Sequence, residues 1–308
     1  MPTDRHFEFH FNAQQRLWRA RFNAMGSTGE ILVDADKNAL QQPMLDAVRT
    51  AAQEVWRIED KYSRYLNTSV ISRLNQQAGK AQTVDPETAG LLNFAAQCYQ
   101  LSDGLFDITS GLLRKIWRFG SDGLTTFPEP VQITQLLPHI GWQRLTWTGT
   151  DLTLPEGMEI DFGGIVKEYA VDRTLLQLSA ALNLPCLVNL GGDLRCNQSR
   201  AGGAPWNLGL ENPDSVQEAI GALSLHAGAL ATSGDTRRFF MHQGTRYGHI
   251  LNPLTGYPVM GAPRSITVAA PTCTEAGILS TLAMLQGVQA GDFLREQQVP
   301  HWIIGEVK

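Results

Sequence analysis

The sequence lacks several features that mark out large classes of proteins. It has no stretch approaching about 18 uncharged apolar residues, so no membrane-spanning helix is predicted. It has no run of lysine or arginine and its formal net charge is -5, so a surface for nucleic acid or an anionic membrane is not expected. With 43% hydrophobic and 18% charged residues, the 308-residue chain can bury a sizeable core, as one domain or two closely associated lobes.

Cysteine is also scarce, and the amino terminus lacks an apolar segment. The four cysteines lie far apart without a C-x-x-C pair, so neither a zinc knuckle nor a disulfide framework is indicated, and we expect free thiols, three of them buried. The first ten residues, M-P-T-D-R-H-F-E-F-H, carry charges where a signal peptide needs apolar residues. We therefore expect a cytoplasmic protein. Residues 1–15 show no clear period and are predicted to form a loose arm, followed by a single domain over 16–308.

Helical periodicity and helix-start signals predict helices beginning near Pro43, Ser69, Asp85, Ile165 and Thr274. Alternating or short apolar runs predict strands at Trp18–Ala24, Glu30–Val33, Cys186–Asn189, Trp206–Leu210, Ala229–Thr232, Arg237–Met241, Gly248–Leu251, Ser265–Ala270 and Trp302–Ile304. Helices are concentrated early in the chain and strands late, with short connections. This order predicts an α+β fold with mixed, largely antiparallel sheets and packed helices.

The stretch Asp161–Asp172, D-F-G-G-I-V-K-E-Y-A-V-D, combines a strand exit, a glycine pair and a lysine at a helix start. Gly163 and Gly164 permit a tight turn, and the backbone N–H groups of the helix start form a favourable site for an anion. Lys167 lies in the first helical turn, where its ammonium could neutralise a phosphate. Taken alone, the pattern is more typical of an ordinary strand-to-helix turn with a surface lysine.

Three further loops leave predicted regular elements with glycine or small hydroxyl residues. They read N-L-G-G-D from Asn189, A-T-S-G from Ala231 and H-I-L-N-P-L-T-G from His249. Each one alone is compatible with an ordinary β-turn. Their joint presence with the Asp161–Asp172 stretch favours a shared binding site.

Read together, these segments resemble the FAD:protein FMN transferases, the ApbE family, over most of the chain from Met25 to about Gly287. The matching motifs appear in the family's order as A-M-G-S-T, S-R-Y-L-N-T-S-V-I-S-R-L-N, F-D-I-T-S-G-L-L, D-F-G-G-I-V-K-E-Y-A-V-D, N-L-G-G-D, A-T-S-G, H-I-L-N-P-L-T-G and A-G-I-L-S-T. The resemblance implies an ApbE-like, T-fold-like architecture. It also implies transfer of FMN from FAD to a threonine hydroxyl of an acceptor flavoprotein, assisted by Mg²⁺.

The same resemblance assigns roles to individual residues. It places Met25 and Tyr65 against the flavin or its attached chain, although Met25 could equally be a core residue. The remaining implied contacts to FAD come from Leu105, Phe106, Asp107, Asp161, Lys167 and Ile250, of which Phe106 could likewise be a core residue. For the metal, the resemblance implies the hydroxyl of Thr281 and the backbone carbonyl of Gly164.

His249 is the predicted general base. A threonine hydroxyl is a poor nucleophile at neutral pH, and a neutral imidazole within hydrogen-bond reach can take its proton. A lone histidine on a strand is usually structural, but this one lies in the family's H-x-x-x-P-x-T-G pattern. By contrast His6, Glu8 and His10, which are close in sequence, fall in the predicted arm and are expected to be exposed.

Three positions depart from the family pattern. Gly277 stands where the family has a metal-binding aspartate, Asn252 where it has aspartate, and Glu168 where it has glycine. Glu275 would face elsewhere on the helix and is not expected to substitute. A cation with one fewer anionic ligand binds more weakly, and Glu168 is expected to repel phosphate or to neutralise Lys167. The alternatives are therefore a transferase with a remodelled metal site, an FAD-binding homologue with weak or lost transfer, and cleavage of FAD to FMN and AMP.

Overall fold

An eight-stranded sheet forms the centre of the molecule. The computed structural model describes residues 5–39, 41–119, 127–213, 215–235 and 238–305, without the side chains of 215–218. The strand order is β1-β2-β3-β7-β8-β11-β14-β15, and every pair of neighbours is antiparallel. Its strands are β1 (Phe7–Asn12), β2 (Leu17–Ala24), β3 (Ser27–Val33), β7 (Cys186–Leu190), β8 (Asp193–Cys196), β11 (Gly228–Gly234), β14 (Ser265–Ala270) and β15 (His301–Ile304). The predicted class, α+β with largely antiparallel strands, is confirmed.

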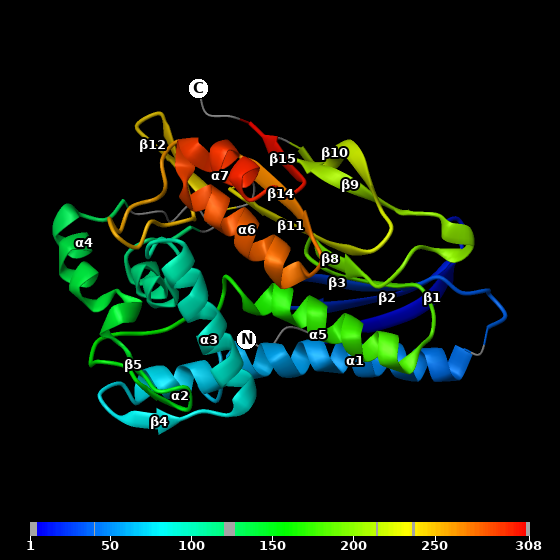
Figure 1. Cartoon of the computed structure of the whole chain (residues 1–308), viewed down its shortest axis with the longest axis horizontal. Helices are drawn as coiled ribbons and strands as arrows, with labels where there is room; N and C mark the ends of the chain where they lie inside the picture. The colour runs from blue at the N-terminus through cyan, green and yellow to red at the C-terminus, as the bar shows by residue number, and fades with distance from the viewer. Residues whose placement is uncertain (1–4, 40, 120–126, 214, 236–237, 306–308) are drawn as a thin grey trace.

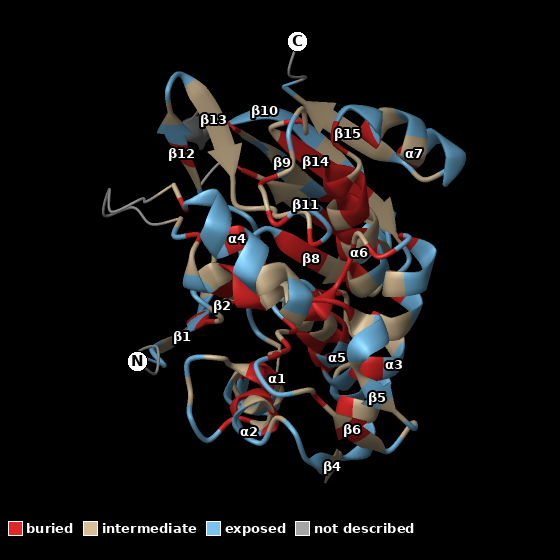
Figure 2. Ribbon diagram, turned by 90° about the vertical axis from the view of Figure 1, so that its left-hand side faces the viewer, coloured by how far each residue is buried: buried red, intermediate tan, exposed pale blue. Residues whose placement is uncertain are grey.

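Helices cover one face of this sheet. The long helices α1 (Gln41–Tyr62), α5 (Val166–Ala181) and α6 (Cys273–Leu285) lie side by side over it (Figure 1). Successive strand residues point to opposite faces, so Val188 enters the main core under the helices, whereas Leu187 packs against Trp206 of a hairpin on the other face. That hairpin consists of β9 (Trp206–Asn212) and β10 (Ser215–Leu225). The buried residues concentrate where α6 meets the central strands (Figure 2).

Shorter elements surround this framework. None of the helices in the described ranges is long and apolar enough to cross a membrane. The helices are α2 (Val70–Gln76), α3 (Pro86–Leu101), α4 (Pro130–Leu136) and α7 (Ala290–Glu296), with 3-10 turns η1 (Ile108–Lys115), η2 (Leu137–His139), η3 (Trp142–Arg144), η4 (Ala201–Gly203) and η5 (Gly287–Gln289). The strands are β4 (Ala81–Thr83), β5 (Thr146–Trp147) and β6 (Asp151–Thr153), which form one small sheet, and β12 (Phe239–His242) and β13 (Thr245–Gly248), which form a hairpin.

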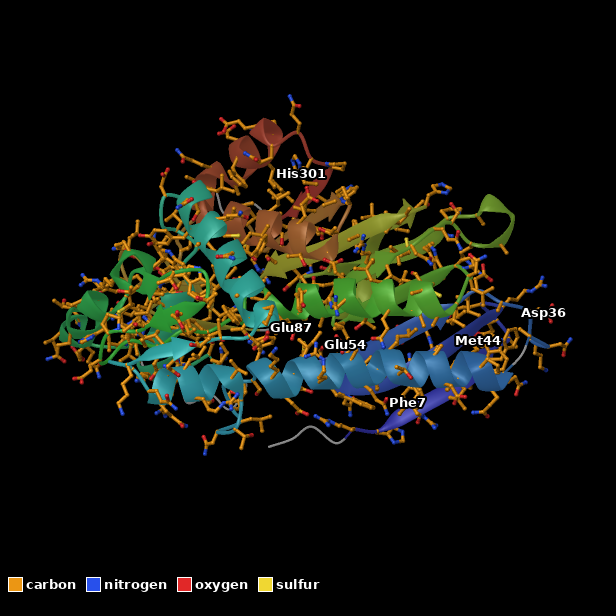
Figure 3. All side chains as sticks on the ribbon, turned by 60° about the horizontal axis from the view of Figure 1, so that its bottom comes forward. Phe7, Asp36, Met44, Glu54, Glu87 and His301 are labelled. Carbon is orange, nitrogen blue, oxygen red and sulfur yellow. The ribbon has the colours of Figure 1, made fainter. Side chains whose placement is uncertain are left out.

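Glu87, at the start of α3, connects three helices. Its carboxylate accepts hydrogen bonds from Arg57 and Lys61 of α1, each at 2.7 Å, and from the hydroxyl of Tyr169 of α5 at 2.9 Å. Arg57 also bonds Glu54 of α1, and Figure 3 shows Glu87, at the start of α3, over α1 near Glu54. Burial opposes the charge of Glu87, but the cationic partners outweigh it and lower its pKa to about 2. This network fixes the first turn of α5, which carries Lys167.

Asp172 connects α5, α6 and β8. Its carboxylate accepts hydrogen bonds from the backbone N–H groups of Cys273 (2.9 Å) and Thr274 (2.8 Å), and from Arg195 of β8 (2.9 Å). The first N–H groups of a helix have no partner within the helix. A residue of α5 therefore caps α6 and sets its position over the sheet.

A second, smaller core lies beside the sheet. Trp117 contacts Phe240 of β12, with ring centroids 6.0 Å apart, and its indole N–H donates to the carbonyl of Gly256 at 2.7 Å. The other buried members of this core are Leu112, Leu113, Ile133 and Ile140. This core joins η1 to the segment that contains His249.

Three expectations, about the amino-terminal arm, one strand and the cysteines, are wrong. The predicted loose arm over 1–15 contains β1, which pairs with β2, and Phe9 stacks on Trp18 with centroids 5.1 Å apart; residues 1–4 lie outside the described residues. The predicted strand Gly248–Leu251 is absent, because β13 ends at Gly248 and Leu251 makes only an isolated bridge to Pro258. All four cysteines are buried, rather than three. The predicted strand start at Arg237 lies outside the described residues.

Candidate functional site

Turns and strand ends that carry the motifs gather at one end of the sheet. The β2–β3 turn meets the β7–β8 turn, where the N–H of Gly191 donates to the carbonyl of Thr28 at 3.2 Å. Gly191 has a φ of +62° and a Cβ there would lie 2.9 Å from Cβ of Ser27, so both conformation and space require glycine. Two motifs distant in sequence, A-M-G-S-T and N-L-G-G-D, are therefore neighbours.

Met25 occupies the β2–β3 turn in the left-handed region, with a φ of 52°. Its N–H donates to the Glu59 carboxylate of α1 at 2.7 Å, and its partly buried side chain packs against the main core. The carbonyl of Glu59 in turn accepts from the N–H of Ser63, two residues before Tyr65. The turn is thus fixed to the end of α1, where the next motif begins.

Lys167 connects three of the motifs. Its ammonium forms an ion pair with Asp193, which follows the Gly191–Gly192 turn and is only 2% exposed. The other carboxylate oxygen of Asp193 accepts from the N–H of Thr232 at 2.9 Å. Burial acts to lower the pKa of Lys167, but the negative charges of Asp193 and Glu168 outweigh it and raise this pKa. The site therefore contains a protonated lysine that is held in place by its ion pair with Asp193.

Asp161 is held by Arg64, a residue that the sequence analysis did not select. Its carboxylate forms an ion pair with Arg64 and accepts from the N–H of Gly163 at 2.9 Å. Arg64 also donates to the hydroxyl of Tyr65 at 2.9 Å and lies 4.9 Å from the centre of its ring. Tyr65 is 73% exposed, so its aromatic ring is available to a ligand. The signal for Arg64 was present as the S-R-Y sequence after a long helix.

The segment Leu105–Asp107 packs against the glycine pair. A Cβ at Gly164 would lie 3.2 Å from the ring of Phe106, so this turn approaches the ring closely, while Leu105 packs at the edge of the main core. The Asp107 carboxylate accepts from the N–H groups of Thr109 (2.8 Å) and Trp142 (2.9 Å), and burial raises its pKa. Asp107 thus shapes the loop; contacts of these three residues with a nucleotide remain predictions.

Hydroxyl groups link the end of β11 to α6. The Ser233 hydroxyl lies 3.0 Å from that of Thr281 and 2.9 Å from that of Ser280. The Ser280 hydroxyl also donates to the carbonyl of Gly277 at 3.0 Å. The structure therefore places Thr281 beside the A-T-S-G motif, and it adds Ser233 and Ser280 to the group.

His249 lies directly after β13, and one nitrogen of its imidazole is not hydrogen-bonded to any of the described residues. Its backbone N–H donates to the carbonyl of Arg238 at 3.1 Å, while the carbonyl of the next residue, Ile250, accepts from Val259 at 3.0 Å. The Nδ1 atom is shielded from solvent and has no hydrogen-bond partner among the described residues. Burial, followed by the positive charge of Arg238 and more weakly that of Lys167, lowers the pKa of His249 to about 4.

We expect the imidazole of His249 to remain neutral in the free protein from neutral pH down to about pH 5, because its pKa is about 4 rather than the usual 6.5. Titration of the histidine side chains by NMR, with His249→Asn used to assign the resonance, measures this pKa. A midpoint for His249 at or above that of ordinary histidines would contradict the expectation.

Asn252, which stands where the family has aspartate, makes the turn contacts that an aspartate could make. Its side-chain oxygen accepts from the N–H groups of Leu254 (2.8 Å) and Thr255 (3.3 Å), as in a turn stabilised by Asp or Asn. An amide oxygen supplies this acceptor as a carboxylate does. The loop after His249 is therefore built without an aspartate.

Comparison with known proteins agrees with this geometry. The model of the ApbE family matches residues 25–303. The chain is 31% identical to an FAD:protein FMN transferase of Vibrio cholerae, over 85% of this chain and 81% of that protein. A similar protein of Haemophilus influenzae, with the same name, is 29% identical over 83% of this chain and 77% of that protein.

Solved structures share the architecture. The ApbE protein of Thermotoga maritima has a TM-score of 0.83 and 30% identity, covering 93% of this chain and 94% of that one. The flavin transferase ApbE of Vibrio cholerae has a TM-score of 0.80 and 26% identity, covering 98% and 95%. With motifs, fold and sequence in agreement, this chain belongs to the ApbE family.

Proposed function

We propose that this protein transfers FMN from FAD to a threonine hydroxyl of an acceptor protein. The observation that carries the proposal is the convergence of the family's motifs around Lys167 and His249, with a positive charge and an unpartnered imidazole nitrogen in one region. The matched relatives named FAD:protein FMN transferase support the reaction class. The exposed Tyr65 and the left-handed Met25 turn are the proposed contacts for the flavin part of FAD.

In the proposed reaction His249 takes the proton of the threonine hydroxyl as its oxygen attacks the phosphorus of the FMN half. The bond between that phosphorus and the bridging oxygen breaks, and AMP leaves with the electron pair. Lys167 offsets the negative charge of the pyrophosphate, and Asp193 holds the lysine in place. A threonine ester of FMN and AMP are the products, with one proton released.

We also propose that Mg²⁺ assists this reaction. When bound, a hard cation neutralises charge that develops on the transferring phosphate. The proposed protein ligands are the hydroxyl of Thr281, which the Ser233 network orients, and the carbonyl of Gly164. Oxygen donors of this kind suit Mg²⁺. The described residues contain no cluster of three or more His, Cys, Asp or Glu side chains that could hold a metal, so substrate oxygens would complete the coordination.

The test combines the full-length protein, FAD, Mg²⁺ and a flavoprotein domain that bears an acceptor threonine. The expected result is a fluorescent adduct whose mass increases by one FMN residue, and no adduct on the matched acceptor with threonine replaced by alanine. AMP without an adduct would identify cleavage of FAD instead. FAD binding with neither product would favour the alternative of an FAD-binding homologue with weak or lost transfer.

A further inference from the structure

Glu168 of α5 and Gly277 of α6 occupy the same space between the two helices. A Cβ built on Gly277 would lie 2.5 Å from Cγ of Glu168 and 3.1 Å from its carboxyl carbon. Contacts below about 3 Å are not tolerated by real side chains without movement. The side chain of Glu168 therefore fills the volume that any side chain at position 277 would need.

The Glu168 carboxylate is not the ion-pair partner of Lys167, although its negative charge helps to raise the pKa of that lysine. Lys167 forms its ion pair with Asp193, whereas from the sequence Glu168 was expected to repel phosphate or to neutralise Lys167. The Oε2 atom of Glu168 is shielded from solvent and lacks a hydrogen-bond partner within the described ranges. A buried carboxylate oxygen without a partner is costly unless a ligand supplies one.

The surroundings of this carboxylate are rich in oxygen. Thr281 lies one turn after Gly277 on α6, on the same face of the helix. The hydroxyl of Ser233 lies 3.0 Å from that of Thr281 and is itself 2.9 Å from that of Ser280. A carboxylate together with hydroxyl and carbonyl oxygens is a ligand set for a hard divalent cation.

We propose that Glu168 provides, from α5, the carboxylate ligand of the cation, in the space that Gly277 leaves open beside Thr281. The anionic ligand that is absent at position 277 is then supplied by the opposite helix. This inference rests on the proposed function for the identity of the cation as Mg²⁺. It concerns metal binding, which is measurable without transfer of FMN.

The experiment measures Mg²⁺ affinity by isothermal titration of the full-length protein with FAD present and no acceptor. Glu168→Gln keeps the shape of the side chain and removes its charge. We expect it to weaken Mg²⁺ binding by about 10-fold or more, since even outer-shell partners of a metal site have effects of that size. Glu275→Gln is the matched control, because Glu275 is an exposed carboxylate two residues from Gly277. It should leave Mg²⁺ affinity unchanged.

A reciprocal exchange tests the shared space. Gly277→Asp alone is expected to lower the midpoint of thermal unfolding in EDTA, because its side chain meets Glu168. The double variant Glu168→Gly, Gly277→Asp should regain that midpoint and bind Mg²⁺ more tightly than Glu168→Gly. If Glu168→Gln fails to fold, this double variant still decides the question.

The outcomes separate the inference from the proposed function. Wild-type Mg²⁺ affinity in Glu168→Gln, no Mg²⁺ binding by the wild-type protein, or a double variant no better than Glu168→Gly would each overturn the ligand role. FAD binding is measured separately in EDTA by quenching of flavin fluorescence. Loss of FAD binding, or absence of an adduct in the transfer assay, counts against the proposed function alone.

Discussion

His249→Asn is expected to lower kcat/KM for FMN transfer by about 10²–10⁴-fold, the usual contribution of a general base. The substitution keeps the backbone N–H that bonds Arg238 and removes the imidazole that would accept the proton. The affinity for FAD should change little, since the proposed anchor of the pyrophosphate is Lys167. Transfer to the acceptor threonine is followed by flavin fluorescence, and FAD binding by quenching in the same preparation.

His226→Asn is the matched control for this prediction. His226 is an exposed residue whose ring bonds Ser199 at 3.0 Å, and its replacement should leave transfer unchanged. If His249→Asn transfers FMN nearly as fast as the wild type, the base lies elsewhere. If it loses FAD binding instead, His249 binds the cofactor rather than activating the threonine.

Asp172→Ala is expected to reduce the free energy of unfolding by about 3 kcal/mol, as when one partner of a buried, hydrogen-bonded ion pair is removed. The change leaves Arg195 of β8 without this carboxylate and removes the acceptor for the first N–H groups of α6. Urea unfolding followed by circular dichroism measures the loss.

Asp292→Ala provides the comparison for Asp172. Asp292 pairs with Arg295 on α7, but both side chains are more than 65% exposed, so this pair should contribute less than about 1 kcal/mol. Equal losses in the two variants would show that the cap on α6 adds no particular stability. Asp172→Asn, which retains one acceptor oxygen, should lie between the two.

Elements with strong local signals could be predicted from the sequence. The helices α3 and α2 begin where Asp85 and Ser69 accept hydrogen bonds from the following backbone N–H groups, as their sequence patterns indicated. Strand β1 was not predicted, although Phe7, Phe9 and Phe11 alternate with Glu8 and His10 in the pattern of a half-buried strand. Its apolar side chains acquire a partner only when Phe9 meets Trp18 across the β1–β2 pair, and a search along a single segment does not detect that contact.

The site was predictable as a set of residues but not as a set of contacts. Motif order identified Lys167, Asp161 and Thr281, whereas their partners Asp193, Arg64 and Ser233 come from distant segments. The neighbouring positions of Lys167 and Glu168 in the sequence were also a poor guide to their contacts. Residues next to each other on a helix do not face each other. Lys167 accordingly forms its ion pair with Asp193 and not with Glu168.

The contact between Glu168 and Gly277 also restricts the mutational routes open to this sequence. A carboxylate can reach the space from α5 or from α6, but both cannot fit there at once. Any two-step route that moves the carboxylate from one helix to the other passes through an intermediate with two overlapping side chains or with none. The fitness effect of a change at one position therefore depends on the residue at the other, and neither position can be evaluated alone in a variant of this protein.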